Sequence, residues 1–290
     1  MGNVRGACSG LVSNVLSKEE HMAKRLLCML VLQAIAVAQP AMAQRYDDSD
    51  TDRFALKLGN YAVQDTRTRV RVDKSGGILG TVLDLEDTLD VDSTADVARL
   101  DGYYRFNPRH RLVFSYFKID RDGTAGLLED VQFGDELFGA GARVNTDIES
   151  EVLKVGYSYS YIHVKQFEFG IGAGLHVTNT EVSMKGTNTS QSEDVDGTAP
   201  LPVVSGSGRF DLTPKLRVQA KYDLFFLSTD SYDGTFSDFL LSLEHQTFKN
   251  AGFGLGYNRI NIDFETDDGE WRGEFESVNN GWLLYLKMGF

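Results

Sequence analysis

Strict alternation of side-chain character runs through much of the chain and limits its fold more than any other feature. Over 153–161 every odd position is a large apolar or aromatic residue, and every even position is small or polar. The same pattern recurs over 167–178, 216–226 and 282–290. A helix would space its apolar residues three and four apart, whereas a strand points successive side chains to opposite faces. The pattern therefore predicts an all-β protein whose strands have one apolar face.

Short and long connections alternate between the predicted strands, as they do in outer-membrane barrels. Tight joints fall near 107–109, 163–165, 213–215 and 249–251, and long polar joints near 121–143, 184–200 and 265–273. The stretch 185–200 has the composition of an exposed loop. The predicted strands are 53–62, 95–106, 110–120, 144–162, 166–183, 201–212, 215–229, 236–248, 251–264 and 274–290.

Ten strands form the predicted wall, with eight and twelve as alternatives. Residues 67–72 and 78–85 flank Gly76-Gly77 and are predicted to form a hairpin inside the first long loop. If both segments entered the wall, the count would be twelve. An even number puts both termini on the periplasmic side.

An apolar outer face requires closure of the sheet. Unpaired backbone groups cost several kcal/mol each in hydrocarbon, so only an antiparallel transmembrane β-barrel can present such a face to lipid. A soluble β-sandwich also alternates, but its connections lack this short–long rhythm. Aromatic residues at the tight turns and at the chain end predict a girdle at one membrane interface. They are Phe106, Tyr161, Phe167, Phe210, Phe248, Phe253 and Phe290.

An export signal precedes this pattern. Residues 22–25 form a basic head, 26–37 are almost wholly apolar, and Ala41-Met42-Ala43 has the small-x-small form of a cleavage site. The apolar stretch is shorter than the roughly 20 residues that a membrane-spanning helix needs. We therefore predict an upstream extension at 1–21, a signal peptide at 22–43 that is cleaved after Ala43, and a barrel domain at 44–290. Met22 is the predicted start of translation.

Composition excludes several function classes for the mature chain. Both cysteines, Cys8 and Cys28, precede the cleavage site, so the mature chain has no disulfide, thiol nucleophile or cysteine metal ligand. Removing 1–43 leaves 25 basic and 40 acidic residues, a net charge of −15. So acidic a chain is a poor binder of nucleic acid.

Charges of both signs fall at positions that face inward. A barrel of about ten strands is little wider than one of eight, which side chains nearly fill. Ion pairs packed in the lumen are therefore favoured over an open polar pore. The inward charges are Lys57, Arg99, Arg105, Lys154, Arg217, Lys221 and Lys287, with Asp101, Glu168, Asp223 and Glu244.

The last strand, 282–290, alternates and ends in Phe290. It resembles the signal that the barrel-assembly machinery recognises. Together with the export signal and the hairpin rhythm, it makes 44–290 resemble the small bacterial outer-membrane barrels of the outer-membrane protein A and W type. The resemblance implies location in the cell outer membrane, contact with lipid and lipopolysaccharide, and contact with the assembly machinery during biogenesis. It carries over no functional residue.

A structural or small-solute transport role is the expected function, without catalysis. The alternative is a lipid-modifying hydrolase, which needs a base and a nucleophile in reach of each other. His176-Val177-Thr178-Asn179 differs from the His-x-Ser-Asn of barrel deacylases by Thr at the nucleophile. We predict no catalytic, cofactor-binding or metal-binding residue. The other mature histidines are His110, His163 and His245, and the acidic loop positions include Asp120, Asp122, Asp263 and Glu265.

Overall fold

A computed structural model describes residues 52–73, 80–228, 232–266 and 273–290. The predicted upstream extension, the signal peptide and its cleavage site after Ala43 lie outside these residues, as does Gly76-Gly77. Within the described residues ten strands form the wall, so the predicted count is confirmed. They are β1 (Phe54–Val72), β3 (Ala95–Asn107), β4 (His110–Gly126), β7 (Arg143–His163), β8 (Phe167–Gly186), β9 (Ser192–Asp211), β10 (Leu216–Ser228), β11 (Tyr232–His245), β12 (Ala251–Thr266) and β13 (Gly273–Gly289).

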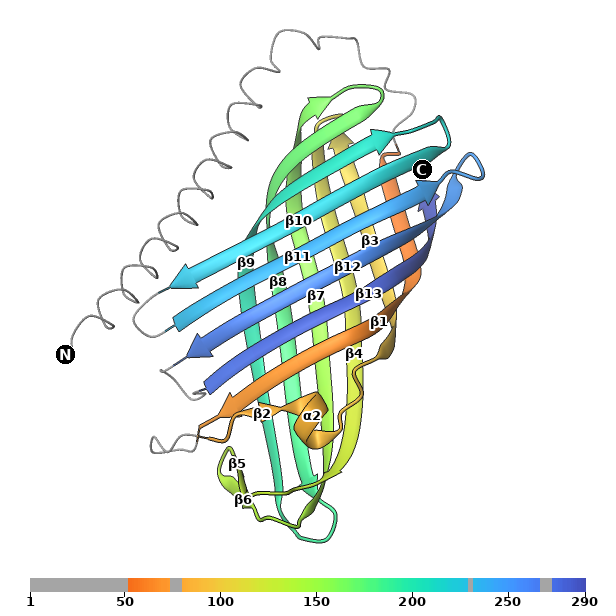
Figure 1. The fold of residues 1–290 in the computed structure, drawn as a ribbon. Coiled ribbons are helices and arrows are strands. Elements are labelled where there is room, and N and C mark those ends of the chain that lie inside the picture. The colour runs from red at the N-terminus through yellow and green to blue at the C-terminus, as the bar shows by residue number, and fades with distance from the viewer. Residues whose placement is uncertain (1–51, 74–79, 229–231, 267–272) are drawn as a thin grey trace, which may run out of the picture. The chain divides into compact units, whose positions relative to one another are not determined.

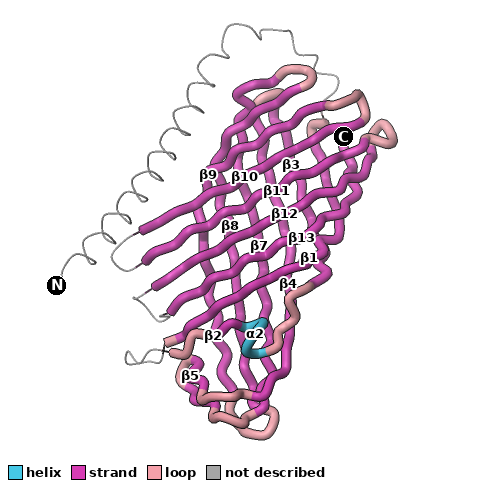
Figure 2. Tube along the Cα trace, viewed as in Figure 1, coloured by secondary structure: helices cyan, strands magenta, loops and turns pink. Residues whose placement is uncertain are grey.

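Each wall strand pairs antiparallel with the next along the chain, and β13 pairs back to β1 (Figures 1 and 2). This closing seam runs from Ala55↔Gly289 to Val72↔Gly273, with one register shift between Val63 and Asp65. The predicted all-β, antiparallel barrel is therefore confirmed. No helix among the described residues is long and apolar enough to cross a membrane.

The two ends of the barrel differ, as the sequence predicted. The tight joints after β3, β7, β9 and β11 meet at one end, called here the short-turn end, where the chain also finishes. The opposite end, called the long-loop end, carries the remaining connections. Strands there are longer than predicted, and 192–200 pairs with β8 instead of forming a loop. The polar composition of 185–200 misled the prediction, because strands that project beyond a bilayer need no apolar face.

The hairpin predicted in the first long loop forms only in part. Residues 67–72 continue β1 and pair with β13, while only β2 (Leu83–Asp84) pairs with Arg69 and Val70. A short helix, α2 (Leu85–Leu89), follows β2, and the Asp84 carboxylate caps it by accepting a hydrogen bond from the Asp87 N–H at 3.2 Å. The next long loop forms a separate hairpin of β5 (Val131–Phe133) and β6 (Glu136–Phe138).

These loop elements build an apolar core at the long-loop end, called here the cap cluster. Side chains from α2, β5 and β6 pack against the distal ends of the wall strands. Burying this surface stabilises loops that would otherwise lack a core. The cluster comprises Val70, Val72, Leu83, Leu85, Leu89, Val91, Leu127, Val131, Phe133, Phe138, Val144, Ile148, Val182 and Met184.

The two faces of the wall follow the alternation. On β3, Tyr104 and Phe106 are exposed on the outer face, whereas Arg99 and Arg105 are buried inside, as predicted. Other strands expose large apolar residues in the same way. Together they form an apolar belt around the short-turn half, including Leu153, Val155, Tyr157, Ile171, Leu175, Val204, Tyr222, Leu224, Leu241, Leu243, Leu255, Trp282, Leu284 and Leu286.

Candidate functional site

The lumen of the short-turn half is filled by charged side chains. Every inward charge that the sequence predicted has an ion-pair partner inside the barrel, which supports the packed-lumen interpretation. Three groups of contacts lie around Glu168, Glu244 and His176.

Glu168 on β8 holds the first group. Its side chain is almost wholly buried and lies 3.2 Å from Arg105, 3.7 Å from Arg111 and 3.6 Å from Arg209. The Ser160 hydroxyl also donates to it. Because the arginines come from β3, β4 and β9, one carboxylate links four strands on one side of the barrel. The sequence analysis missed Arg111 and Arg209, although both occupy inward positions of their strands.

Glu244 on β11 holds the second group, which lies at the closing seam. Its carboxylate forms ion pairs with Lys57 of β1 at 3.0 Å and with Lys287 of β13 at 3.1 Å, and Arg217 of β10 lies 3.7 Å away. The Tyr285 hydroxyl donates to it at 3.3 Å. Charges brought from three wall strands therefore meet on one buried carboxylate, and the seam is held by side chains as well as by its backbone ladder.

The third group lies nearer the middle of the barrel. Lys154 bonds Asp238, and Lys221 lies 2.8 Å from Asp223. Beside them Arg99 donates to Asn258 at 2.5 Å and pairs with Asp101 at 2.9 Å. Asp238 and Asn258 also escaped the sequence analysis. Both lie at inward-facing positions of their strands, and this could have identified them. However, the apolar residues Leu240 and Ile260 also face inward, which makes the alternation of those two strands harder to recognise.

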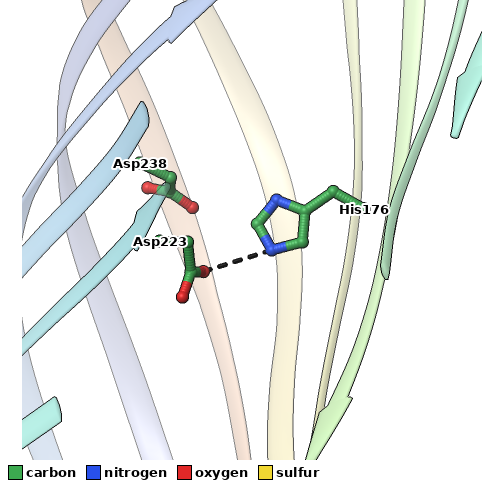
Figure 3. Close-up of side chains that lie close together, drawn as sticks. All are labelled: His176, Asp223 and Asp238. Carbon is green, nitrogen blue, oxygen red and sulfur yellow. Dashed lines mark ion pairs between the residues drawn. The ribbon is translucent and has the colours of Figure 1, made fainter. Parts of the chain in front are cut away.

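His176 on β8 points toward two carboxylates from β10 and β11 (Figure 3). Its Nε2 lies 3.1 Å from Asp223 Oδ2, and its ring packs edge-on against Phe236 with centroids 4.9 Å apart. The sequence placed His176 inward but could not name these partners, because they lie far along the chain. In the described part of the chain, one group of potential metal ligands lies close together: donor atoms of His176, Asp223 and Asp238 within 4.8 Å of one another.

A divalent cation would meet competition at this group. Lys221 is already ion-paired with Asp223, and Lys154 is ion-paired with Asp238. A metal ion would have to displace both ammonium groups and leave the buried Lys154 without a partner, which is costly. The donor set is therefore better described as a set of internal ion pairs than as a metal centre.

A hydrolytic site needs more than the His176–Asp223 pair. Thr178 lies two residues along β8 and shares the inward face, but its buried hydroxyl has no hydrogen bond among the described residues, nor has His176 Nδ1. The base–nucleophile bond that such chemistry requires is therefore not formed here. The other histidines lie near tight turns: His110 bonds Tyr157, His163 lies 3.5 Å from Glu168, and His245 contacts Thr247 at 3.1 Å.

Little open space remains among these charges. The cavity that they line has a volume of about 170 Å³. Residues from nine of the ten wall strands border it, many of them polar, so the space suits bound waters rather than a continuous channel.

Comparisons with known proteins identify the fold. No family model matches the chain, and no curated protein matches its sequence. The crystal structure of the outer membrane protease OmpT from Escherichia coli aligns over 85% of this chain and 99% of its own, at 10% identity and a TM-score of 0.52. The translocator domain of the autotransporter NalP from Neisseria meningitidis aligns over 95% and 99%, at 11% identity and a TM-score of 0.44.

Ail of Yersinia pestis, in complex with the heparin analogue sucrose octasulfate, aligns over 80% of this chain and 97% of its own, at 12% identity and a TM-score of 0.37. At identities this low, the likeness to OmpT concerns the fold alone. The chain thus has the fold of a bacterial outer-membrane β-barrel.

Proposed function

We propose that this chain is an outer-membrane barrel of the structural or small-solute transport class, that its lumen is closed to ions, and that it has no catalytic role. Its surroundings in this proposal are outer-membrane lipid and lipopolysaccharide, reached after signal-peptide cleavage and assembly by the barrel machinery. The apolar belt supports the membrane location, because a soluble protein rarely exposes so large an apolar surface.

The observation that carries the closed lumen is the Glu168 group. Its four strands lie on one side of the barrel, and the Glu244 group adds strands from the other side. Buried charges that pair this closely are held in place, since separating one leaves the other uncompensated. An ion crossing the barrel would have to break these contacts.

Single-channel recording in planar bilayers tests this directly. The wild type should show almost no conductance. Replacing Arg105 and Glu168 together by serine should raise conductance severalfold, because it removes two large side chains from the constriction and one charge of each sign. The matched control replaces the outer-face pair Lys118 and Glu149, 2.7 Å apart, by serine and should change nothing. A large, steady conductance of the wild type would refute the closed lumen.

The His176–Asp223 contact favours a second candidate, a lipid-modifying hydrolase. Asp223 could orient His176 as a base, as carboxylates do in catalytic triads. Mass spectrometry of lipid A from cells that overexpress the wild type or His176→Gln tests it. We expect the two lipid A profiles to be the same as that of cells without the protein. A change in acylation that His176→Gln abolishes would establish the hydrolase instead.

A further inference from the structure

The wall is incompletely paired between β9 and β10. Their ladder runs from Arg217↔Asp211 only as far as Leu224↔Val204. Beyond it, β9 continues to pair with β8 as far as Ser192, and β10 continues to pair with β11 as far as Ser228. Figure 1 shows the two strands diverging toward the long-loop end. Residues 192–203 and 225–228 therefore border a lateral gap in the hydrogen-bonded wall.

The sequence itself disfavours closing this gap. Pro200 and Pro202, two of the chain's five prolines, lie on the part of β9 that pairs with β8 but not with β10. Proline has no N–H to donate to a ladder, so within sheets it is confined to edges, strand starts and bulges. The two prolines therefore disfavour pairing of this part of β9 with β10, and the gap follows from the sequence of β9.

An apolar cavity lies against the gap. Its volume is about 560 Å³, within the range of roughly 300–1,000 Å³ typical of small-molecule sites. Phe225 and Leu227 from the edge of β10 line it together with Leu201 from the edge of β9. Further apolar lining comes from Val70, Val72, Val182, Val195, Ala199, Ile262, Phe264 and Phe275.

The charges around the cavity restrict what it can hold. Among the described residues no lysine or arginine lines it, and the two acids that do, Asp196 and Asp263, are exposed. A carboxylate or phosphate headgroup would therefore find repulsion and no cationic partner here, whereas an uncharged apolar molecule meets mainly aromatic and aliphatic side chains. Four threonines also line the cavity: Thr178, Thr180, Thr198 and Thr235.

The gap opens at the edge of the apolar belt nearer the long-loop end. Val204 and Leu224, its last paired residues, are exposed apolar residues, and Phe226 just beyond is 83% exposed. Farther along β9 the exposed positions turn polar, with Thr198 and Asp196. If the long-loop end faces outward, this level corresponds to the outer leaflet.

We propose that this cavity binds a small, uncharged apolar molecule that enters from the outer leaflet through the β9–β10 gap. The inference rests on the membrane location proposed above but not on a closed lumen. An apolar molecule dissolved in lipid would reach the gap without crossing water, and its transfer into the cavity would cover both the aromatic rings and the unpaired strand edges.

Two glycines of β9 offer a matched pair of variants. Gly197 lines the cavity, and a Cβ added there meets no atom within 4 Å. Gly206 also has this open space, but it lies beside Val204 and Ser205 on the paired part of β9, away from the cavity. Gly197→Phe should therefore fill the cavity without strain, whereas Gly206→Phe adds the same ring elsewhere on the same strand.

Binding of the uncharged fluorescent probe N-phenyl-1-naphthylamine to the mature barrel in lipid nanodiscs tests the proposal, with empty discs subtracted. Wild type and Gly206→Phe should bind it saturably, and Gly197→Phe should bind it about tenfold or more weakly. Ala199→Leu, a smaller filling change, should also weaken binding and serves if Gly197→Phe fails to fold. Decanoate, which is anionic, should not compete, whereas decanol should.

The outcomes separate this proposal from the one on which it rests. No saturable binding to the wild type, or equal binding by Gly197→Phe and Ala199→Leu, overturns the apolar site. Fractionation of the same cells reports the membrane location independently. To test the lateral route, Phe226→Cys carrying a bulky maleimide, in the otherwise cysteine-free mature chain, should slow probe association. Unchanged association would mean that the probe enters from the aqueous mouth and would overturn the outer-leaflet route.

Discussion

Replacing Glu168 by alanine should lower the free energy of unfolding by roughly 3–5 kcal/mol, the cost of removing one partner from a buried ion pair. The side chain is 2% exposed, and three arginines lie within 3.7 Å of it. Without the carboxylate these cations face one another in a space too small for full hydration. Denaturant unfolding of the barrel refolded into vesicles measures the loss.

A surface carboxylate provides the control for this prediction. Glu149 pairs with Lys118 at 2.7 Å on the outer face, and its side chain is 50% exposed. Solvent screens such pairs, so Glu149→Ala should cost about 1 kcal/mol or less. Equal losses for the two variants, or no loss for Glu168→Ala, would mean that the lumen is hydrated and that its charges do not depend on one another.

The sequence predicted the wall well because a strand's period of two is a local property. Alternation alone placed Arg99 and Arg105 inside and Tyr104 and Phe106 outside, and the structure agrees. Tight turns could be located for the same reason, since a break in alternation marks each one. The charged residues of the lumen could be predicted from their inward-facing positions in the alternation, without knowing which strands face each other.

Properties that depend on contacts between residues far apart in the chain could not be predicted from the sequence. The partners of His176 come from β10 and β11, and nothing near His176 along the chain points to Asp223 or Asp238. Residues 192–200 read as a loop because their composition is polar, yet pairing with β8 makes them strand. The β9–β10 gap is likewise a missing contact between strands. In the sequence, only Pro200 and Pro202 indicate it.

The cap cluster escaped prediction for a different reason. Its apolar residues lie in short elements such as α2 and β5, which are too brief to establish a period. Leu85 and Phe133 are fully buried there, so the loops at this end have a core of their own. The composition of these segments predicted exposed loops, whereas in the folded protein their apolar side chains pack together.

Replacing Phe290 by alanine should reduce the amount of assembled barrel in the outer membrane severalfold while leaving the stability of folded protein nearly unchanged. The backbone of Phe290 closes the seam: its N–H donates to Phe54 O at 2.9 Å, and its carbonyl accepts from Arg53 N–H at 2.7 Å. Alanine retains both bonds. The ring itself is 66% exposed, so its loss removes little packing from the folded state.

A ring that contributes little to the folded barrel but ends an alternating last strand fits recognition before folding is complete. Phe248, 72% exposed in the joint between β11 and β12, provides the matched control, since Phe248→Ala also removes an exposed ring near the short-turn end. Heat-modifiable protein in outer-membrane fractions should fall for Phe290→Ala and not for Phe248→Ala, whereas both should unfold in vitro like the wild type. Normal assembly of Phe290→Ala would contradict this prediction. So would a fall in the amount of assembled protein that is matched by an equal loss of stability in vitro. In either case the terminal ring has no separate role in assembly and contributes only as a girdle residue.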